Sequence, residues 1–299
     1  MNVAVQVVVP AAAVLMLFAL GLTLDGGSLA RLLQQPRGLL IGLASRWLLV
    51  PSLAVAICLV DRPAAPIALG LLLVASCPPA TPAPALVRAG GGDTALGVAL
   101  TAATNLASAV VLPLLLSVGS VLVGIEGRVD PASLARVALR IGALVIVPTL
   151  LGMALRRGRP ALARRLEPRV TPFALMLLVP ITVLVLVSSR EVVIPSLVAS
   201  GAVALQLNLA ALVGAALLAR IGRLPPGEAL AVVVSSSLFN FGLGAFVSLT
   251  LLGDPRVFVP GISYGALMWL TAAPVAAWAR RAAARRRGEP VGQGAVGRG

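Results

Sequence analysis

A single arginine and one group of hydroxyl and amide side chains interrupt otherwise apolar stretches of this 299-residue sequence. Arg46 lies inside the apolar stretch 38–60, and the run Ser235-Ser236-Ser237 precedes Asn240 in the stretch 227–251. A buried guanidinium offers a fixed positive charge to an anion, and its insertion cost in a membrane implies a partner or a purpose. The hydroxyls and the amide offer hydrogen bonds. Together these groups suit the binding of a small anionic solute.

The sequence lacks the residue patterns that would predict an enzyme. Histidine, the residue that most often activates a serine nucleophile, is absent. The run Gly90-Gly91-Gly92-Asp93 resembles an aspartyl intramembrane protease motif, but no second aspartate lies inside another apolar stretch. We therefore interpret it as a turn in which Asp93 caps the following helix. The prediction is a protein that is not an enzyme and that needs no cofactor.

The composition predicts an all-α integral membrane protein. Apolar residues make up 59% of the chain, charged residues make up 11%, and the mean hydropathy is +1.03, which exceeds the needs of one soluble core. The net charge of +14 comes from arginines grouped between apolar stretches, so we predict no nucleic-acid partner. A span needs about 20 apolar residues to cross ~30 Å of hydrocarbon. We predict one polytopic domain over residues 1–299 with about nine transmembrane helices, at 4–24, 38–60, 65–88, 93–124, 134–155, 170–189, 193–220, 227–251 and 257–280.

The placement of arginines predicts an orientation in the membrane. If the N-terminus is outside, most of the 24 basic residues fall in cytoplasmic segments, as the positive-inside rule requires. We therefore predict a multi-pass protein of a bacterial-type inner (cytoplasmic) membrane, with its N-terminus outside and its C-terminus in the cytoplasm. The basic tail 281–299 is interpreted as a cytoplasmic anchor, with an anionic-lipid site at Arg285–Arg287 as the alternative. The sequence predicts no particular oligomeric state.

Two of the predicted spans contain residues that interrupt a transmembrane helix. In the stretch 65–88, four prolines between residues 78 and 84 remove backbone donors, so the helix must unwind there. In the stretch 227–251, three serines, an amide and two glycines favour a second unwinding. Each interrupted span is the third of a four-helix set, at about 4–124 and about 134–280, and the intervening fifth span inverts the second set. Inverted repeats with two discontinuous helices are typical of secondary transporters.

Short motifs occur in a fixed order along the chain: Gly21-Leu22-Thr23-Leu24, Pro36 with Ile41-Gly42, Gly70 with Cys77-Pro78 and Thr81, Arg88 with Asp93-Thr94-Ala95-Leu96, and Asn240 with Gly242-Leu243. In these motifs the sequence resembles the bile acid:sodium symporter family over nearly its whole length. The resemblance implies a core domain with two discontinuous, crossing helices and a panel domain that rocks against it. It also implies secondary active or facilitative transport of a small organic anion by alternating access. A channel or a structural membrane protein is a more distant alternative, since a channel would show rings of charged or repeated polar residues.

The polar residues and the resemblance together predict a solute site near the crossing of the broken helices. Arg46 is expected to act as its electrostatic anchor, and snorkelling toward the cytoplasmic surface is the alternative interpretation. For the remaining polar residues the alternative is hydrogen bonding between helices. The predicted solute-binding residues are Arg46, Thr81, Asn105, Asn208, Ser235, Ser236, Ser237 and Asn240.

The resemblance implies coupling to sodium. This sequence, however, differs from the first sodium-binding motif of the family. Ala83 and Pro84 stand where the family has a serine and an asparagine. Gly97 stands at a later position that in the family is a serine ligand. Of that first site, only Thr101 is retained as a sodium-binding position.

The second sodium motif departs from the family as well. Ser235 replaces a sodium-binding carboxylate, Phe239 replaces a glutamine, and Arg46 replaces a glutamine that faces the second ion. Thr101 and Ser235 are thus the predicted positions for a sodium ion. Two coupling modes stay open: sodium symport as in the family, and sodium-independent uniport or exchange in which Arg46 replaces the charge of the ion.

Overall fold

The computed structural model describes residues 3–23, 36–124, 131–188 and 190–286. Regular secondary structure within these residues is helical throughout, as the composition predicts. In chain order the elements are α1 (Val3–Thr23), α3 (Pro36–Ala44), the π-helical turn η1 (Ser45–Leu49), α4 (Val50–Asp61), α5 (Ala65–Ser76), α6 (Ala83–Ala89), α7 (Thr94–Leu122), α8 (Pro131–Gly158), α9 (Pro160–Ser188), α10 (Arg190–Ile221), α11 (Pro226–Ser237), α12 (Phe241–Ala245), the π-helical turn η2 (Phe246–Leu251) and α13 (Pro255–Arg286).

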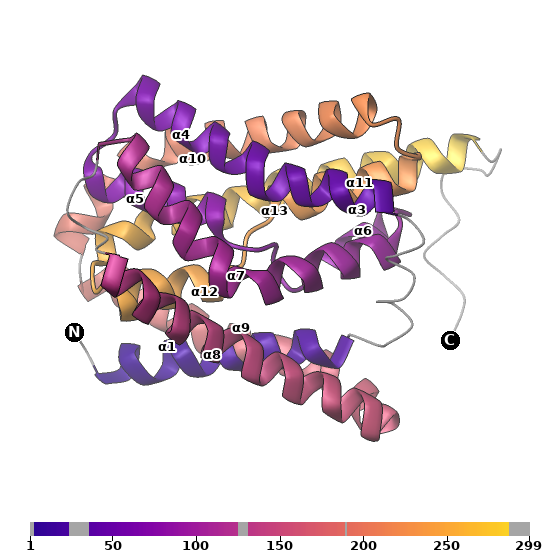
Figure 1. The fold of residues 1–299 in the computed structure, drawn as a ribbon, viewed down its shortest axis with the longest axis horizontal. Helices are drawn as coiled ribbons and strands as arrows, with labels where there is room; N and C mark the ends of the chain where they lie inside the picture. The colour runs from indigo at the N-terminus through magenta and orange to yellow at the C-terminus, as the bar shows by residue number, and fades with distance from the viewer. Residues whose placement is uncertain (1–2, 24–35, 125–130, 189, 287–299) are drawn as a thin grey trace.

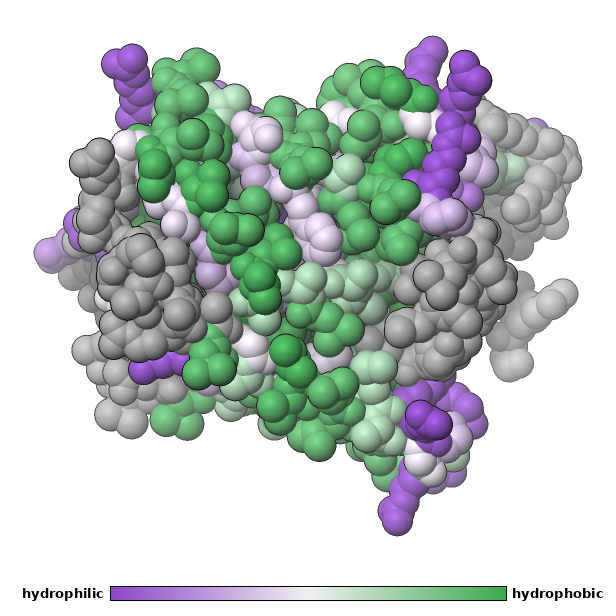
Figure 2. Space-filling view, viewed as in Figure 1, coloured by the Kyte–Doolittle hydropathy of each residue, from purple (hydrophilic) through white to green (hydrophobic). Residues whose placement is uncertain are grey.

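Six segments of the described chain are long and apolar enough to cross a membrane. The fold is therefore that of a multi-pass helical membrane protein. Helices lie in each predicted range, but α1 and α5 contribute shorter apolar helices and α9 is not among the six segments, so nine spans and their orientation stay predictions. Figure 2 shows apolar side chains across the middle of the visible face and hydrophilic ones toward its two ends. The six segments are Pro36–Asp61, Thr94–Leu122, Leu139–Gly158, Pro195–Ile221, Pro226–Leu251 and Pro255–Arg285.

The helices form two layers (Figure 1). One layer consists of α1, α8 and α9, which pack against one another, and the other contains the remaining helices. Within the first layer, a Cβ atom on Gly21 would lie 2.2 Å from the carbonyl oxygen of Thr149, and one on Gly152 would lie 2.3 Å from that of Phe18. Glycine at both positions thus allows α1 and α8 to approach closely. Contacts of α1 with α12 and η2 join the two layers.

The first interrupted helix, α5 followed by α6, breaks where the prolines lie. α5 ends at Ser76, and Cys77 is extended, with φ −67° and ψ 146°. A residue that precedes a proline is disfavoured in the helical region, which explains this conformation before Pro78. Pro78 also has no N–H, so the carbonyl oxygen of Val74, four residues earlier, has no helical donor. The break predicted from the prolines is therefore present.

The second interrupted helix, α11 followed by α12, breaks without a proline. α11 ends at Ser237, and the side-chain oxygen of Asn240 caps α12 by accepting the N–H of Leu243 at 3.1 Å. The main-chain N–H of Asn240 donates to the carbonyl oxygen of Pro78 at 2.8 Å, so the two breaks meet. The carbonyl oxygen of Ser236 therefore loses the donor that would serve it in a continuous helix.

Protein encloses this crossing of the two breaks. In the span Pro226–Leu251, 94% of the most apolar 18-residue window is buried, against 28–44% in the other five spans. In α5 the residues 67–76 are buried throughout. Unwound backbone at membrane depth is tolerated only where protein or a water-filled cavity satisfies it. The carbonyl groups freed at the breaks must therefore find partners within the chain.

The π-helical turn η1 lies between α3 and α4 and carries Arg46. The N–H of Val50 donates to the carbonyl oxygen of Ser45, five residues earlier. Pro51 explains this turn, because in an α-helix its ring would clash with the carbonyl group of Trp47, to which it also has no N–H to donate. The Arg46 side chain points into the protein and is 2% exposed.

Candidate functional site

The Arg46 guanidinium lies at the crossing and binds main-chain carbonyl oxygens of both broken helices. Nη1 donates to the carbonyl oxygen of Ser236 at 3.0 Å. Nη2 donates to the carbonyl oxygen of Val74 at 3.2 Å and also to that of Cys77. Nε is buried without a hydrogen-bond partner. Because the side chain is buried and bonded in this way, Arg46 does not snorkel to the surface.

Two helix C-termini balance the charge of Arg46. A helix C-terminus carries roughly half a negative elementary charge, and both α5 and α11 end beside the guanidinium. Within the described residues no carboxylate forms an ion pair with Arg46, whereas Arg256 and Asp254 pair at 3.0 Å near the surface. The two helix ends supply about one compensating charge. The chain thus accommodates a buried arginine without an acidic partner.

The three consecutive serines at the end of α11 have different surroundings. The hydroxyl oxygens of Ser236 and Ser45 lie 2.8 Å apart, which links α11 to η1. The hydroxyl of Ser237 donates to the carbonyl oxygen of Val234 at 3.2 Å within its own helix. The hydroxyl of Ser235 is buried without a hydrogen-bond partner. The serine run therefore meets Arg46 through the main-chain carbonyl group of Ser236.

The last carbonyl group of α11 is satisfied by two side chains, one from α10 and one from α13. The oxygen of Ser237 accepts from Asn208 Nδ2 at 3.3 Å and from the Tyr264 hydroxyl at 2.8 Å. The hydroxyl of Thr271 in turn donates to Asn208 Oδ1 at 2.6 Å. Tyr264 and Thr271 are not among the predicted site residues. Tyr264 is the sole tyrosine of the sequence, and a lone phenol in an apolar stretch is the signal that would have identified it.

A chain of amides connects the crossing to α7. Asn240 Nδ2 donates to Asn105 Oδ1 at 3.4 Å, and Asn105 Nδ2 donates to the carbonyl oxygen of Thr101 at 2.7 Å. The hydroxyl of Thr101 donates to the carbonyl oxygen of Gly97 at 2.9 Å within α7. Asn105 and Asn240 thus act as hydrogen-bonding partners between helices.

The residues around Arg46 do not fit a sodium ion. Transporters with broken helices bind sodium through carbonyl oxygens at helix C-termini. Here three such oxygens already bind the guanidinium, and a second positive charge beside it would be repelled. Among the described residues, no group of three or more Cys, Asp or Glu side chains could hold a metal ion. Thr101 and Ser235 stay predictions as sodium positions.

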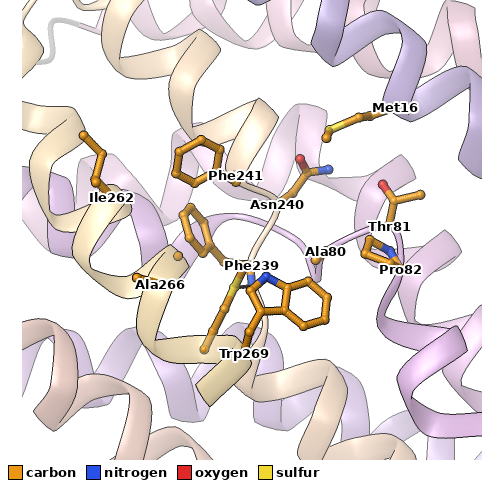
Figure 3. A pocket seen from close by; sticks show the side chains of 12 residues that line it. Met16, Ala80, Thr81, Pro82, Phe239, Asn240, Phe241, Ile262, Ala266 and Trp269 are labelled. Atoms are coloured by element: carbon orange, nitrogen blue, oxygen red, sulfur yellow. Dashed lines mark hydrogen bonds between the residues drawn. The ribbon is translucent and has the colours of Figure 1, made fainter. Parts of the chain in front are cut away.

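A cavity of about 360 Å³ lies next to the crossing (Figure 3). Its polar residues are Thr81 from the first break and Asn240 from the second, and Figure 3 shows their side chains near each other. The hydroxyl of Thr81 is buried without a hydrogen-bond partner. The other predicted site residues do not line the cavity. Its lining consists of Met16, Ala80, Thr81, Pro82, Phe239, Asn240, Phe241, Ile262, Gly265, Ala266, Met268 and Trp269.

Aromatic side chains form one side of this cavity. The Phe239 ring lies edge-on to the Phe241 ring, with 6.0 Å between ring centroids, and edge-on to the Tyr264 ring at 5.4 Å. Trp269 from α13 and Met16 from α1 add apolar surface. A mostly apolar cavity with a few convergent polar groups is the usual form of a small-molecule site. The arrangement can hold an amphipathic solute with one polar end.

These features define a multi-pass membrane protein with a solute-sized cavity beside two broken helices. The family model described as "Sodium Bile acid symporter family" matches residues 10–196, and the chain belongs to this family. It is similar to the "Probable sodium/metabolite cotransporter BASS2, chloroplastic" of Oryza sativa subsp. japonica, with 27% identity over 163 residues, or 54% of this chain. It is also similar to the "Uncharacterized sodium-dependent transporter YocS" of Bacillus subtilis (strain 168), with 32% identity over 102 residues, or 34% of this chain.

The two similarities cover limited parts of those relatives. The matched regions amount to 37% of the rice protein and 32% of the Bacillus protein. The chain therefore matches about a third of the length of each relative. The family is described as one of symporters, and the two relatives are named as a cotransporter and a transporter.

Proposed function

We propose that this protein moves a small organic anion across a membrane by alternating access, as a secondary active or facilitative transporter. The observation that carries the proposal is the cavity bounded by both breaks, by Met16 of α1 and by α13. Such a cavity lies between the two layers of helices, so a relative movement of the layers would expose it first to one side of the membrane and then to the other. In this proposal α1, α8 and α9 form the panel domain.

The order of the helices supports two inverted repeats. In the first, α5 and α6 form a broken third member that is followed by α7. In the second, α11 and α12 form a broken third member that is followed by α13. The single helix α8 between the sets would invert the direction of the second set. Solute sites of transporters with this layout lie where the broken helices meet, which is where the cavity lies.

The charges around the cavity favour an anion. Asn240 and Phe241 line the cavity at the start of α12, and α12 continues directly into η2, so a positive helix end faces it. Arg46 binds Cys77, three residues before the cavity residue Ala80, and three residues of extended chain span at most about 10 Å. At that separation and an effective dielectric near ~20, an uncompensated unit charge would attract an anion by about 1.7 kcal/mol. The two helix C-termini offset most of the charge of Arg46, so the positive end of α12 is the main attraction for the anion and Arg46 adds a smaller one without direct contact.

The coupling of transport has two candidate modes. The names of both relatives contain sodium, which favours sodium symport. The three carbonyl oxygens that hold Arg46 favour the second mode, sodium-independent uniport or exchange, because the positive charge is already present. The two modes differ in their response to removal of sodium.

The test is uptake into proteoliposomes that contain the purified protein. Labelled keto acids and steroid conjugates are offered with an inward sodium gradient or with equal potassium. We expect uptake of at least one of these anions above that of protein-free vesicles. Dependence on sodium would select symport, and equal uptake in potassium would select the sodium-independent mode. Absence of uptake of every anion in both salts would contradict the proposed function.

A pair of variants on α13 tests whether the cavity is the solute site. Ala266 lines the cavity, so Ala266→Trp should fill it and lower uptake by roughly tenfold or more. Ala273 lies on the same helix and is similarly exposed, but it is not part of the cavity. Ala273→Trp should therefore retain uptake. Equal uptake by both variants would rule out this cavity.

A further inference from the structure

The main-chain carbonyl oxygens of Val74, Cys77 and Ser236 converge on one guanidinium, and we refer to them as the carbonyl cradle. They come from two helices that are far apart in the sequence and that both end at this point. Each helix end directs its negative dipole toward the same place. The cradle therefore has the ligand type and the charge that suit a hard monovalent cation.

Two of the three oxygens of the cradle, those of Val74 and Ser236, lack a helical main-chain donor for defined reasons. Pro78 has no N–H to donate to Val74, four residues earlier. Asn240 donates its N–H to Pro78 and not to Ser236, again four residues earlier. The first reason is a property of the proline and the second is a bond between the two breaks, so neither is a bond made by Arg46. Without the Arg46 side chain the same oxygens would remain together, buried and unpaired.

We propose that the carbonyl cradle is a latent sodium site that the chain fills with its own cation, the Arg46 guanidinium. Arg46 is buried, donates to all three oxygens and has no acidic partner within the described residues. It thereby excludes a free ion from the cradle. Removal of the guanidinium opens a site in which these carbonyl oxygens bind sodium.

A consequence for coupling follows, and it rests on the proposed function. A tethered cation is neither bound nor released during a transport cycle, so this position contributes no ion gradient to the driving force. Sodium symport by the natural protein would then need an ion site elsewhere in the chain. The latent site itself does not depend on transport, because binding of an ion stabilises the folded protein whether or not a solute moves.

The experiment compares thermal unfolding of the full chain in detergent, in sodium chloride and in choline chloride of equal ionic strength. Arg46→Gln removes the charge and offers an amide oxygen as a further ligand, so sodium should raise its Tm by roughly 5 °C relative to choline. The natural protein should show the same Tm in both salts. Arg46→Lys keeps a tethered cation and should also show no difference between the salts.

Several results would overturn this inference. One is an equal sodium-induced rise in Tm for the natural protein and Arg46→Gln, and another is a folded Arg46→Gln protein that does not respond to sodium. If Arg46→Gln is unstable in choline, its yield of monodisperse protein becomes the measurement. Recovery in sodium alone supports the latent site, and loss in both salts overturns it.

The same variants separate this inference from the proposed function. If sodium stabilises Arg46→Gln but the natural protein transports no anion, the proposed function fails and the latent site stands. If the natural protein transports an anion but Arg46→Gln does not respond to sodium, the latent site fails and the proposed function stands.

Discussion

The two breaks in this protein look alike in the fold but have different origins. The first follows from its own sequence, because Pro78 removes a donor and forces Cys77 into an extended conformation. The second contains no proline and is supported by side chains from elsewhere, namely Arg46, Asn208 and Tyr264, together with the cap at Asn240. The comparison teaches that the first break is local and permanent, whereas the second depends on tertiary contacts. Mutations should therefore affect the two breaks unequally.

The largest effect is expected from Arg46, which supports both breaks. Arg46→Met leaves three buried carbonyl groups without their charged donor and should cost about 3–5 kcal/mol of unfolding free energy. The measurement is thermal unfolding in choline chloride, where we expect Tm to fall by roughly 10 °C. Arg256→Met, which removes an exposed arginine from its pair with Asp254, is the control and should leave Tm unchanged. Similar Tm values for the two variants would show that the crossing does not need the guanidinium.

The second largest effect is expected from Asn240, which supports the second break alone. Asn240→Ala removes the helix cap and the bond to Asn105, at a cost of about 2 kcal/mol. Asn240→Ser retains a cap acceptor and should lose less than half of that stability. Chemical denaturation of both variants measures the difference. A Ser variant as unstable as the Ala variant would assign the effect to the bond with Asn105 and not to the cap.

A smaller effect is expected from Tyr264. Tyr264→Phe removes one of two donors to the carbonyl oxygen of Ser237, and Asn208 retains the other, so the loss should be about 1 kcal/mol. The double change with Asn208→Leu leaves that oxygen unpaired and should cost more than the sum of the single changes. A double-mutant cycle of unfolding free energies provides the measurement. Strict additivity would contradict the shared role of these two residues.

The smallest effect is expected from a single proline of the first break. Pro79→Ala leaves Pro78, Pro82 and Pro84 in place, so the helix cannot re-form and stability should change by less than about 1 kcal/mol. Uptake in proteoliposomes should likewise be retained. A loss comparable to that of Asn240→Ala would mean that the first break is no more robust than the second.

Much of this arrangement follows from local sequence signals. Apolar stretches predict the helices because hydrocarbon tolerates little else, and four prolines predict the first break. The depth of Arg46 in an apolar stretch marks it as a residue that needs a partner. These predictions depend on properties of single segments, which the sequence gives without knowledge of the fold.

The partners of Arg46 and the lining of the cavity cannot be predicted from single segments. The carbonyl groups that bind Arg46 carry no side-chain signature, since Val74 and Ser236 contribute only backbone atoms. Met16 and Trp269 join the cavity because α1 and α13 approach the crossing, and no spacing within either helix encodes that approach. The second break depends on contacts of the same kind. Tertiary contacts thus decide both the cavity and the partner of the arginine.

The extra residue in the π-helical turn η1 sets the direction in which Arg46 points relative to α4. A π turn holds one residue more than an α-helical turn, and each residue of an α-helix turns the chain by about 100°. Deletion of Trp47 or Leu48 would remove that extra residue and rotate Arg46 by about that angle relative to α4, and it would set the ring of Pro51 against the carbonyl group four residues earlier. The guanidinium would then face a different neighbour. The loss of one codon, without any substitution, would therefore suffice to take the positive charge out of the crossing.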